Sequence, residues 1–244
     1  MPPLELTPAE VAGVLERGTL EVVGRMRYSS NGTFLVEASA DGVEIGAVYK
    51  PRRGERPLWD FPDGTLCQRE VAAYEVSHAL GWDIVPVTVM RDDGPLGAGA
   101  VQRFVEHDPE EHYFTLLDDH HDRFRQFAAL DVLLNNTDRK GGHCLRDRAN
   151  DVIIGIDHGL TFHTAWKLRT VIWDFAGEPL PPALADDVCR AVSDAEGGEF
   201  GERLANLLAP HELAAFAIRA TDLVREGHFP DPEPGYHSVP WPLV

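Results

Sequence analysis

The hydrophobic pattern of the chain changes near residue 106, and this change restricts the folds that the chain can adopt. Before that point, short segments alternate apolar and polar residues with the period that is typical of β-strands. These segments are residues 19–28, 33–39, 43–50, 84–90 and 99–106. Residues 67–80 lie among them with apolar residues at helical spacing, and residues 7–15 form a short predicted helix capped by Thr7. The pattern predicts a small antiparallel sheet that carries one helix.

The second part of the chain has the pattern of a helical domain. Apolar residues at helical spacing predict a helix over residues 123–135, and further helices are predicted within residues 183–227. The proline-rich residues 229–244 are expected to run extended along the surface or to be disordered. We therefore predict an α+β fold with a β-rich lobe, residues 1–105, and a mainly helical lobe, residues 106–244.

The charge of the chain excludes several classes of partner. Its formal net charge is −18, which repels the phosphates of nucleic acids and of anionic lipids, so we predict no nucleic-acid partner and no stable membrane anchoring. No apolar run approaches the roughly 20 residues that cross a bilayer, and the first residues lack the pattern of a signal peptide. The three cysteines have neither disulfide nor zinc-site spacing, so a cytoplasmic protein is expected.

Lysine is scarce, because 19 of the 22 basic residues are Arg and only 3 are Lys. Lys50 ends a predicted strand, and Glu70 begins a predicted helix 20 residues later. A strand lysine paired with a helix glutamate fixes an ammonium group against the α- and β-phosphates of ATP in kinase-like folds. A surface lysine at a strand end is the alternative, but the order of Lys50, Glu70 and two later aspartates favours the phosphate contact.

Those two aspartates follow the helix predicted at residues 123–135. Asp138 lies in a polar loop, and Asp157 ends a predicted hairpin, where Gly159 is expected to allow a sharp turn. One carboxylate of such a pair can orient or deprotonate an acceptor hydroxyl, while the other holds Mg²⁺ at the phosphates of ATP. Each aspartate alone is better explained by a solvated turn, whereas the pair together favours phosphoryl transfer.

A polar turn is predicted between the first two strands, at residues 28–33. Its backbone N–H groups and hydroxyls are suited to contact phosphates, although an ordinary hairpin turn has the same composition. The residues predicted to do so are Ser29, Ser30, Asn31, Gly32 and Thr33.

Six motifs occur in the order in which the type II phosphatidylinositol 4-kinases and their bacterial relatives carry them. They are Y-S-S-N-G-T-F-L-V, A-V-Y-K-P, R-E-V-A-A-Y, G-W-D-I-V-P, V-Q-R-F-V-E, and N-T-D-R together with I-D-H-G-L. Over roughly residues 28–163 the chain resembles this branch of the protein-kinase-like superfamily. The resemblance implies a bilobal protein-kinase-like fold, with ATP in the cleft between a small antiparallel β-sheet lobe with one helix and a mainly helical lobe.

The resemblance also implies roles for individual residues. Lys50 would contact the phosphates, Glu70 would steady Lys50, and Asp138 would be the catalytic aspartate. Asp157 would hold a Mg²⁺ or Mn²⁺ ion. One strand would bind adenine through its backbone, and its residues are Gln102, Arg103, Phe104 and Val105.

Two departures from the family pattern limit these implications. His143 stands five residues after Asp138, where the family has a metal-binding asparagine, so His143 is a candidate metal ligand. Cys67 stands alone where the eukaryotic lipid kinases carry a lipid-modified, cysteine-rich insertion. We predict a kinase that moves the γ-phosphate of ATP to a hydroxyl of a protein or small-molecule acceptor. A nucleotide-binding pseudokinase and an AMP-transferring enzyme are the alternatives, and a phosphoinositide acceptor is less favoured because of the net charge.

The acceptor site has a weaker signal in the sequence. Trp166, Trp173 and Phe175 follow the Asp157 turn. They either line an acceptor site or pack the helical lobe, and the packing role is favoured. The sequence does not identify the acceptor itself.

Overall fold

The computed structural model describes residues 6–26 and 31–244, which fall into two compact units. Unit 1 comprises Met1–Val71 with Pro86–Val105, and unit 2 comprises Ala72–Val85 with Glu106–Val244. The division into functional lobes, residues 1–105 and 106–244, stays a prediction. The compact units follow nearly the same boundary, except that residues 72–85 belong to unit 2.

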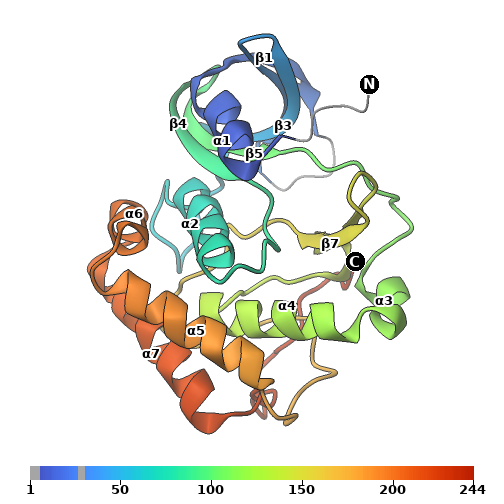
Figure 1. Cartoon of the computed structure of the whole chain (residues 1–244), viewed down its shortest axis with the longest axis vertical. Helices are drawn as coiled ribbons and strands as arrows, with labels where there is room; N and C mark the ends of the chain where they lie inside the picture. Colours follow the sequence, from blue (N-terminus) through green and yellow to red (C-terminus); the bar gives the residue numbers. More distant parts are fainter. Residues whose placement is uncertain (1–5, 27–30) are drawn as a thin grey trace. The chain divides into compact units, whose positions relative to one another are not determined.

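Unit 1 contains a five-stranded antiparallel sheet with the strand order β1-β2-β3-β5-β4 (Figure 1). Its strands are β1 (Thr19–Arg25), β2 (Phe34–Ala40), β3 (Val43–Pro51), β4 (Thr88–Gly94) and β5 (Gly97–Arg103). Val36, Ala38 and Tyr49 are buried, because alternation puts every second side chain of β2 and β3 into the core. β4 begins later than predicted, because Ile84 and Val85 donate their N–H groups to Ser77 Oγ and not to a neighbouring strand.

Helix α1 (Pro8–Arg17) packs against this sheet, and both of its ends are capped. At the start, Thr7 Oγ1 accepts the N–H of Glu10 at 3.3 Å, and the N–H of Thr7 donates to Glu10 Oε2 at 2.8 Å, as the sequence predicts. At the end, the buried guanidinium of Arg91 donates to the carbonyl oxygens of Leu15 and Gly18 at 3.0 and 2.8 Å. These bonds satisfy carbonyl groups that a helix C-terminus leaves without a partner.

Helix α2 (Leu66–Ala79) begins in unit 1 and continues into unit 2. The loop before it contains the short 3₁₀ helix η1 (Arg52–Gly54) and then Glu55. The carboxylate of Glu55 accepts the N–H groups of Leu66 and Cys67, at 3.1 and 2.8 Å. Because two N–H groups of the first turn are bonded to an anion, this cap fixes the turn that leads into Glu70.

Unit 2 is mainly helical and contains one small hairpin. Its elements after α2 are α3 (Tyr113–Leu116), η2 (Leu117–Asp119), α4 (His121–Leu134), η3 (Gly141–His143), β6 (Cys144–Asp147), β7 (Val152–Gly155), α5 (Pro182–Ala195), α6 (Glu199–Leu207) and α7 (Pro210–Glu226). Helix α7 packs against α4, α5 and α6 (Figure 1), and β6 pairs with β7 in antiparallel register. The helices and the hairpin are confirmed. The short helices α3 and η2 were not predicted, because four apolar positions are too few to give a helical period.

The proline-rich end of the chain lies along the surface of unit 2 without helix or strand, and it contains turns and bends, whereas an extended or a disordered segment was predicted. The N–H of Gly177 donates to Phe229 O, and the N–H of Thr170 donates to Ser238 O, both at 3.0 Å. The N–H of Gly141 donates to Leu243 O at 2.6 Å. Backbone contacts therefore hold this segment along loops of unit 2 over most of its length.

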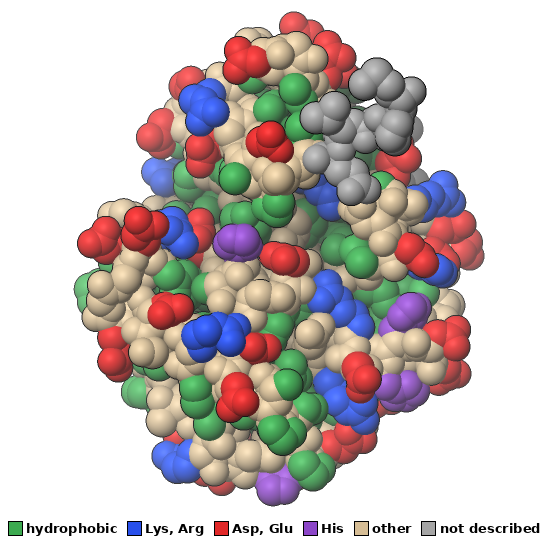
Figure 2. Space-filling view, in the orientation of Figure 1, with side chains coloured by type: hydrophobic (Ala, Val, Ile, Leu, Met, Phe, Trp, Pro, Cys, Tyr) green, Lys and Arg blue, Asp and Glu red, His purple; other side chains and the backbone are tan. Residues whose placement is uncertain are grey.

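Acidic side chains dominate the charged surface. Figure 2 shows Asp and Glu side chains spread over the visible face, with fewer Lys and Arg among them, in agreement with the net charge of −18. A search of residues 6–26 and 31–244 finds no helix that is both long enough and apolar enough to cross a membrane.

Candidate active site

Lys50 and Glu70, predicted to pair from their places in the sequence, form an ion pair within unit 1. Lys50 lies near the end of β3, and its Nζ is 2.5 Å from Oε1 of Glu70 on the first turns of α2. The side chain of Glu70 is 4% exposed and that of Lys50 is 20% exposed. Because burial removes water that would otherwise screen the charges, the pair holds the ammonium group in one place.

The predicted phosphate turn is described only in part. Ser29 and Ser30 lie outside the described residues. The N–H of Gly32 donates to Gly54 O at 2.9 Å, and Asn31 Oδ1 accepts the N–H of Arg56 at 3.1 Å. A Cβ on Gly54 would lie 2.8 Å from Gly32 O, so the close approach requires glycine there. The Gly32 N–H, expected to face a phosphate, is therefore used inside unit 1.

Thr33 and the predicted adenine-binding residues lie in the strands of the same sheet or directly beside their ends. Thr33 is buried, and its carbonyl accepts the N–H of Met26 at 2.9 Å. Gln102 is buried, and its Nε2 donates to Thr88 Oγ1 at 2.8 Å. The N–H groups of Arg103 and Phe104 donate to Val87 O and Gly46 O, each at 2.8 Å, so neither is available to adenine in this structure. Strand β5 ends at Arg103, which leaves Phe104 and Val105 in the segment that follows it.

Asp138 lies in unit 2, in the loop between α4 and η3. The loop leaves α4 through Asn135, whose φ of 50° is left-handed, and the N–H of Asp138 donates to Asn136 Oδ1 at 3.0 Å. Nζ of Lys140 is 3.0 Å from Oδ2 of Asp138. Burial raises the pKa of the Asp138 carboxyl, and the neighbouring Lys140 only partly opposes this shift.

A buried network that the sequence analysis missed supports this loop. Arg139 and Asp131 form an ion pair at 3.0 Å, and both side chains are 0% exposed. Asp131 also accepts hydrogen bonds from Asn136 Nδ2 at 2.9 Å and from Thr170 Oγ1 at 3.0 Å. The Arg139 guanidinium donates to Ile156 O at 3.1 Å, which ties the Asp138 loop to the segment before Asp157. An aspartate within an apolar helical segment was the signal that could have revealed the network.

Asp157 and His143, the two predicted metal ligands, lie side by side in unit 2. His143 Nε2 is 3.5 Å from Oδ2 of Asp157, whose side chain is 54% exposed. The N–H of Ile156 donates to His143 O at 3.0 Å, so the backbone brings η3 and the Asp157 turn together. Asp157 itself has a φ of 63°, a conformation that is uncommon for a residue with a Cβ. A sharp turn was predicted with Gly159 as the residue that allows it, and the left-handed residue of this turn is Asp157, where backbone strain marks the carboxylate.

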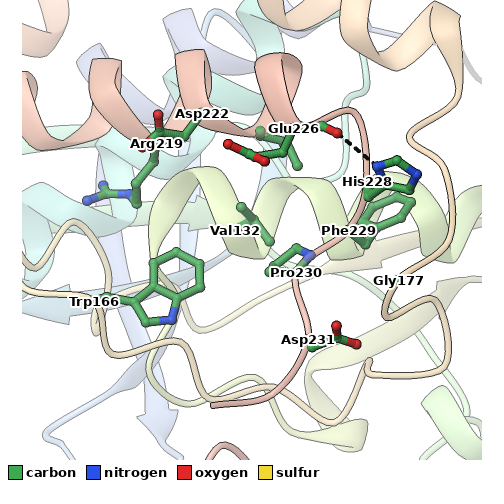
Figure 3. Close-up of a pocket in the computed structure, with 11 residues that line it drawn as sticks. Val132, Trp166, Gly177, Arg219, Asp222, Glu226, His228, Phe229, Pro230 and Asp231 are labelled. Carbon is green, nitrogen blue, oxygen red and sulfur yellow. Dashed lines mark hydrogen bonds between the residues drawn. The ribbon is translucent and has the colours of Figure 1, made fainter.

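The three aromatic residues after Asp157 are placed in different ways. Phe175 is buried, and the indole Nε1 of Trp173 donates to Ser238 O at 3.0 Å, so these two pack unit 2. Trp166 lines a pocket of about 520 Å³ beside α7 and the turn at Phe229 (Figure 3). Arg219 of α7 and Trp166 lie on the same side of this pocket. None of the predicted ATP or metal residues lines it.

The predicted site residues are divided between the two units. Unit 1 presents the ammonium group of Lys50 held by Glu70. Unit 2 presents the Asp138 carboxylate with Lys140 and the Asp157 carboxylate with His143. No cluster of three or more His, Cys, Asp or Glu side chains able to hold a metal ion occurs in the described part of the chain. A Mg²⁺ ion at ATP commonly uses only one or two carboxylates, with phosphate and water oxygens as its other ligands, so Asp157 with His143 fits that use.

Comparison with known proteins identifies a protein family and a relative. A family model described as phosphatidylinositol 3- and 4-kinase matches residues 82–206. Protein Rv2133c of Mycobacterium tuberculosis is 41% identical, and the alignment covers 94% of each chain.

Two solved kinases share the fold at low sequence identity. The Golgi casein kinase with Mn/ADP bound has a TM-score of 0.59 and 16% identity, over 89% of this chain and 74% of that one. The Helicobacter pylori proinflammatory kinase CtkA has a TM-score of 0.54 and 12% identity, over 88% of this chain and 94% of that one. The likeness confirms the predicted kinase-like α+β fold. With the family match covering half of the sequence, this protein belongs to the phosphatidylinositol 3- and 4-kinase family.

Proposed function

We propose that the protein is an ATP-dependent phosphotransferase that moves the γ-phosphate of ATP to an acceptor hydroxyl. The observation that carries the proposal is the ion pair between Lys50 and Glu70, at 2.5 Å. Such a pair between a strand lysine and a helix glutamate positions phosphates in kinases. Membership of a kinase family and the fold shared with two kinases support the same reaction.

The residues of the chain would divide the work as follows. Lys50 would bind phosphate oxygens of ATP, and Glu70 would hold Lys50 in position. Asp138 would accept the proton of the acceptor hydroxyl as the oxygen attacks the γ-phosphorus, and its raised pKa suits a proton acceptor. Lys140, at 3.0 Å from Asp138, would keep that carboxylate oriented.

A divalent cation would be held by Asp157 and His143 together with phosphate oxygens. When bound, it neutralises charge on the phosphates and aligns them for transfer. The solved kinase with Mn/ADP bound supports a divalent cation and an adenine nucleotide as the cofactors. The imidazole of His143 is a softer ligand than the asparagine amide of the family pattern, which favours Mn²⁺ over Mg²⁺.

The decisive experiment is incubation with ATP labelled separately at the α- and γ-phosphates, with Mg²⁺ or Mn²⁺ and mixed protein and small-molecule acceptors. Transfer of the γ label, with release of ADP, is expected. Transfer of the α label would instead establish AMP transfer. Binding of ATP without transfer of either label would establish a pseudokinase. Asp138→Asn serves as the control, because it should bind ATP and transfer no label.

A further inference from the structure

The last residues of the chain lie against the loop that carries the candidate catalytic aspartate. The N–H of Gly141, three residues after Asp138, donates to Leu243 O at 2.6 Å. A Cβ on Gly142 would lie 3.5 Å from Val244 Cγ1, so the loop and residues 243–244 are in contact. Figure 1 places the C-terminal end beside the β6–β7 hairpin, which follows this loop in the sequence.

Backbone hydrogen bonds hold the last residues of the chain, residues 238–244, near both ends of this segment. Ser238 O accepts the N–H of Thr170 and the indole N–H of Trp173, both at 3.0 Å, and Leu243 O accepts the N–H of Gly141. Bonds to main-chain oxygen atoms do not depend on which side chains the bound segment carries. Main-chain recognition of this kind is how proteins bind extended peptides of varied sequence.

Apart from Pro240, which is buried, the side chains of the segment are poorly buried for their type. Trp241 is 86% exposed, Val244 is 53% exposed and Leu243 is 40% exposed. Little apolar surface would be returned to water if the segment left, so its removal costs little free energy. Pro240 and Pro242 each fix their own φ angle, which lowers the entropy lost when the segment binds. The segment is therefore conformationally restricted and can be displaced.

Residues 239–244 read Val-Pro-Trp-Pro-Leu-Val, and none of them has a hydroxyl group. A segment of this composition can lie against the loop that carries Asp138 without accepting a phosphate. We infer that residues 239–244 occupy the path of an acceptor peptide, and that the acceptor is an extended polypeptide segment that displaces them. This inference rests on the proposed phosphotransferase function and names its substrate class.

The transfer itself balances as in any phosphorylation of a hydroxyl. The oxygen of a Ser, Thr or Tyr in the displacing peptide forms a bond to the γ-phosphorus of ATP. The bond between that phosphorus and the bridging oxygen breaks, and ADP leaves with the electron pair. The hydroxyl proton passes to the carboxylate of Asp138.

Placing a hydroxyl in the segment tests the path directly. Trp241→Ser, Leu243→Ser and Val244→Ser should each be incubated with γ-labelled ATP, and the labelled residue should be mapped by mass spectrometry. Phosphate is expected on at least one introduced serine, at a rate that does not depend on protein concentration. Ile218→Ser is the matched control, because Ile218 is 60% exposed on α7 and should gain no phosphate.

Replacing the segment tests displacement without relying on activity. In a full-length variant, residues 239–244 become Gly-Ala-Gly-Ala-Gly-Ala, which adds no hydroxyl. Without Pro240 and Pro242 the replaced segment loses more conformational entropy when it binds, so it is held less tightly although its main-chain oxygen atoms remain. A fluorescent peptide Ser-Val-Pro-Trp-Pro-Leu-Val should therefore bind this variant at least about tenfold more tightly than the wild type, a difference of about 1.4 kcal/mol. If the variant is active, its phosphorylation of casein should also rise.

The outcomes separate this inference from the function on which it rests. If the peptide does not bind the replaced variant, and the introduced serines stay unlabelled while another acceptor is phosphorylated, the acceptor path is wrong and the phosphotransferase stands. If neither the wild type nor any variant transfers γ-phosphate, the proposed function is wrong. Peptide binding then decides only whether residues 239–244 occupy a displaceable peptide site.

Discussion

Lys50 is one of three lysines in the chain, and its ammonium group is held by a nearly buried carboxylate. We expect Lys50→Met to weaken ATP binding or turnover at least about tenfold, because a charge-assisted hydrogen bond contributes about 1.5–3 kcal/mol. Isothermal calorimetry measures the affinity, and circular dichroism checks that the variant is folded. Lys167→Met removes a lysine from unit 2 and should leave ATP affinity unchanged. Wild-type affinity and turnover in Lys50→Met would contradict the phosphate contact.

The pKa of the Asp138 carboxyl is raised, chiefly by burial. The positive charges of Lys140 and Arg139 favour the carboxylate, and the negative charge of Asp157 disfavours it. Because burial raises its pKa, the native state binds this proton more tightly than the unfolded state does. The carboxyl therefore costs stability as pH rises through the window between its ordinary pKa, near 3.8, and its raised value.

Asp138→Asn should remove that cost and abolish transfer. The gain in its free energy of unfolding over the wild type should be larger at pH 7.5 than at pH 4.5, as measured by urea denaturation at both values. A gain that is equal at the two pH values would show that the ion pair with Lys140 cancels the effect of burial, and a loss at pH 7.5 only would show that it outweighs it.

His143 stands beside Asp157 in place of the asparagine in the family pattern. An amide oxygen suits Mg²⁺, whereas imidazole nitrogen favours transition metals. We expect activity to be higher with Mn²⁺ than with Mg²⁺ in the wild type, and His143→Asn to shift the preference toward Mg²⁺ while staying active. Initial rates over a concentration series of each metal give the ratio. The same ratio in both proteins would mean that His143 does not touch the metal.

At the scale of elements, helix α4 anchors the candidate catalytic loop through Asp131. Its carboxylate holds Arg139, Asn136 and Thr170, and the ion pair with Arg139 is fully buried. Asp131→Ala should cost about 3–5 kcal/mol of unfolding free energy, because it leaves the Arg139 guanidinium charged and buried without that carboxylate.

Asp122→Ala is the matched control for Asp131→Ala, since Asp122 lies on the same helix with a fully exposed side chain. Its unfolding free energy should stay close to that of the wild type. Guanidinium denaturation compares the variants, and a loss below about 1 kcal/mol in Asp131→Ala would contradict a supporting role for the network.

At the scale of the whole molecule, the net charge of −18 opposes docking on anionic membranes. We expect no co-sedimentation with vesicles that contain phosphatidylserine or phosphatidylinositol at about 0.15 M salt, a condition in which charges are screened beyond about 8 Å. Vesicles of phosphatidylcholine provide the neutral control. Arg52, Arg53 and Arg56 are basic residues of the loop before α2. Vesicle binding that disappears when these three residues are changed to Ala would overturn this expectation and favour a lipid acceptor.

Local patterns in the sequence determined the order of the elements, and the order of residues typical of kinase-like folds predicted the pairing of Lys50 with Glu70. Alternation and helical spacing depend on neighbours within a few residues, so the sheet of unit 1 and the long helices of unit 2 could be predicted from them. The family motifs then identified the Asp138 loop and the Asp157 turn, because their residues are contiguous in the chain.

Contacts between distant residues were decided only by the tertiary structure. The bond from Cys67 to Glu55, the bond from Thr170 to Asp131, and the bond from Gly141 to Leu243 join residues 12, 39 and 102 positions apart. No local pattern encodes such pairs, because they follow from how packed elements bring their surfaces together. The use of the Gly32 and Arg103 N–H groups inside unit 1 has the same origin. A sequence shows which residues can donate a hydrogen bond, and packing decides which acceptor each of them meets.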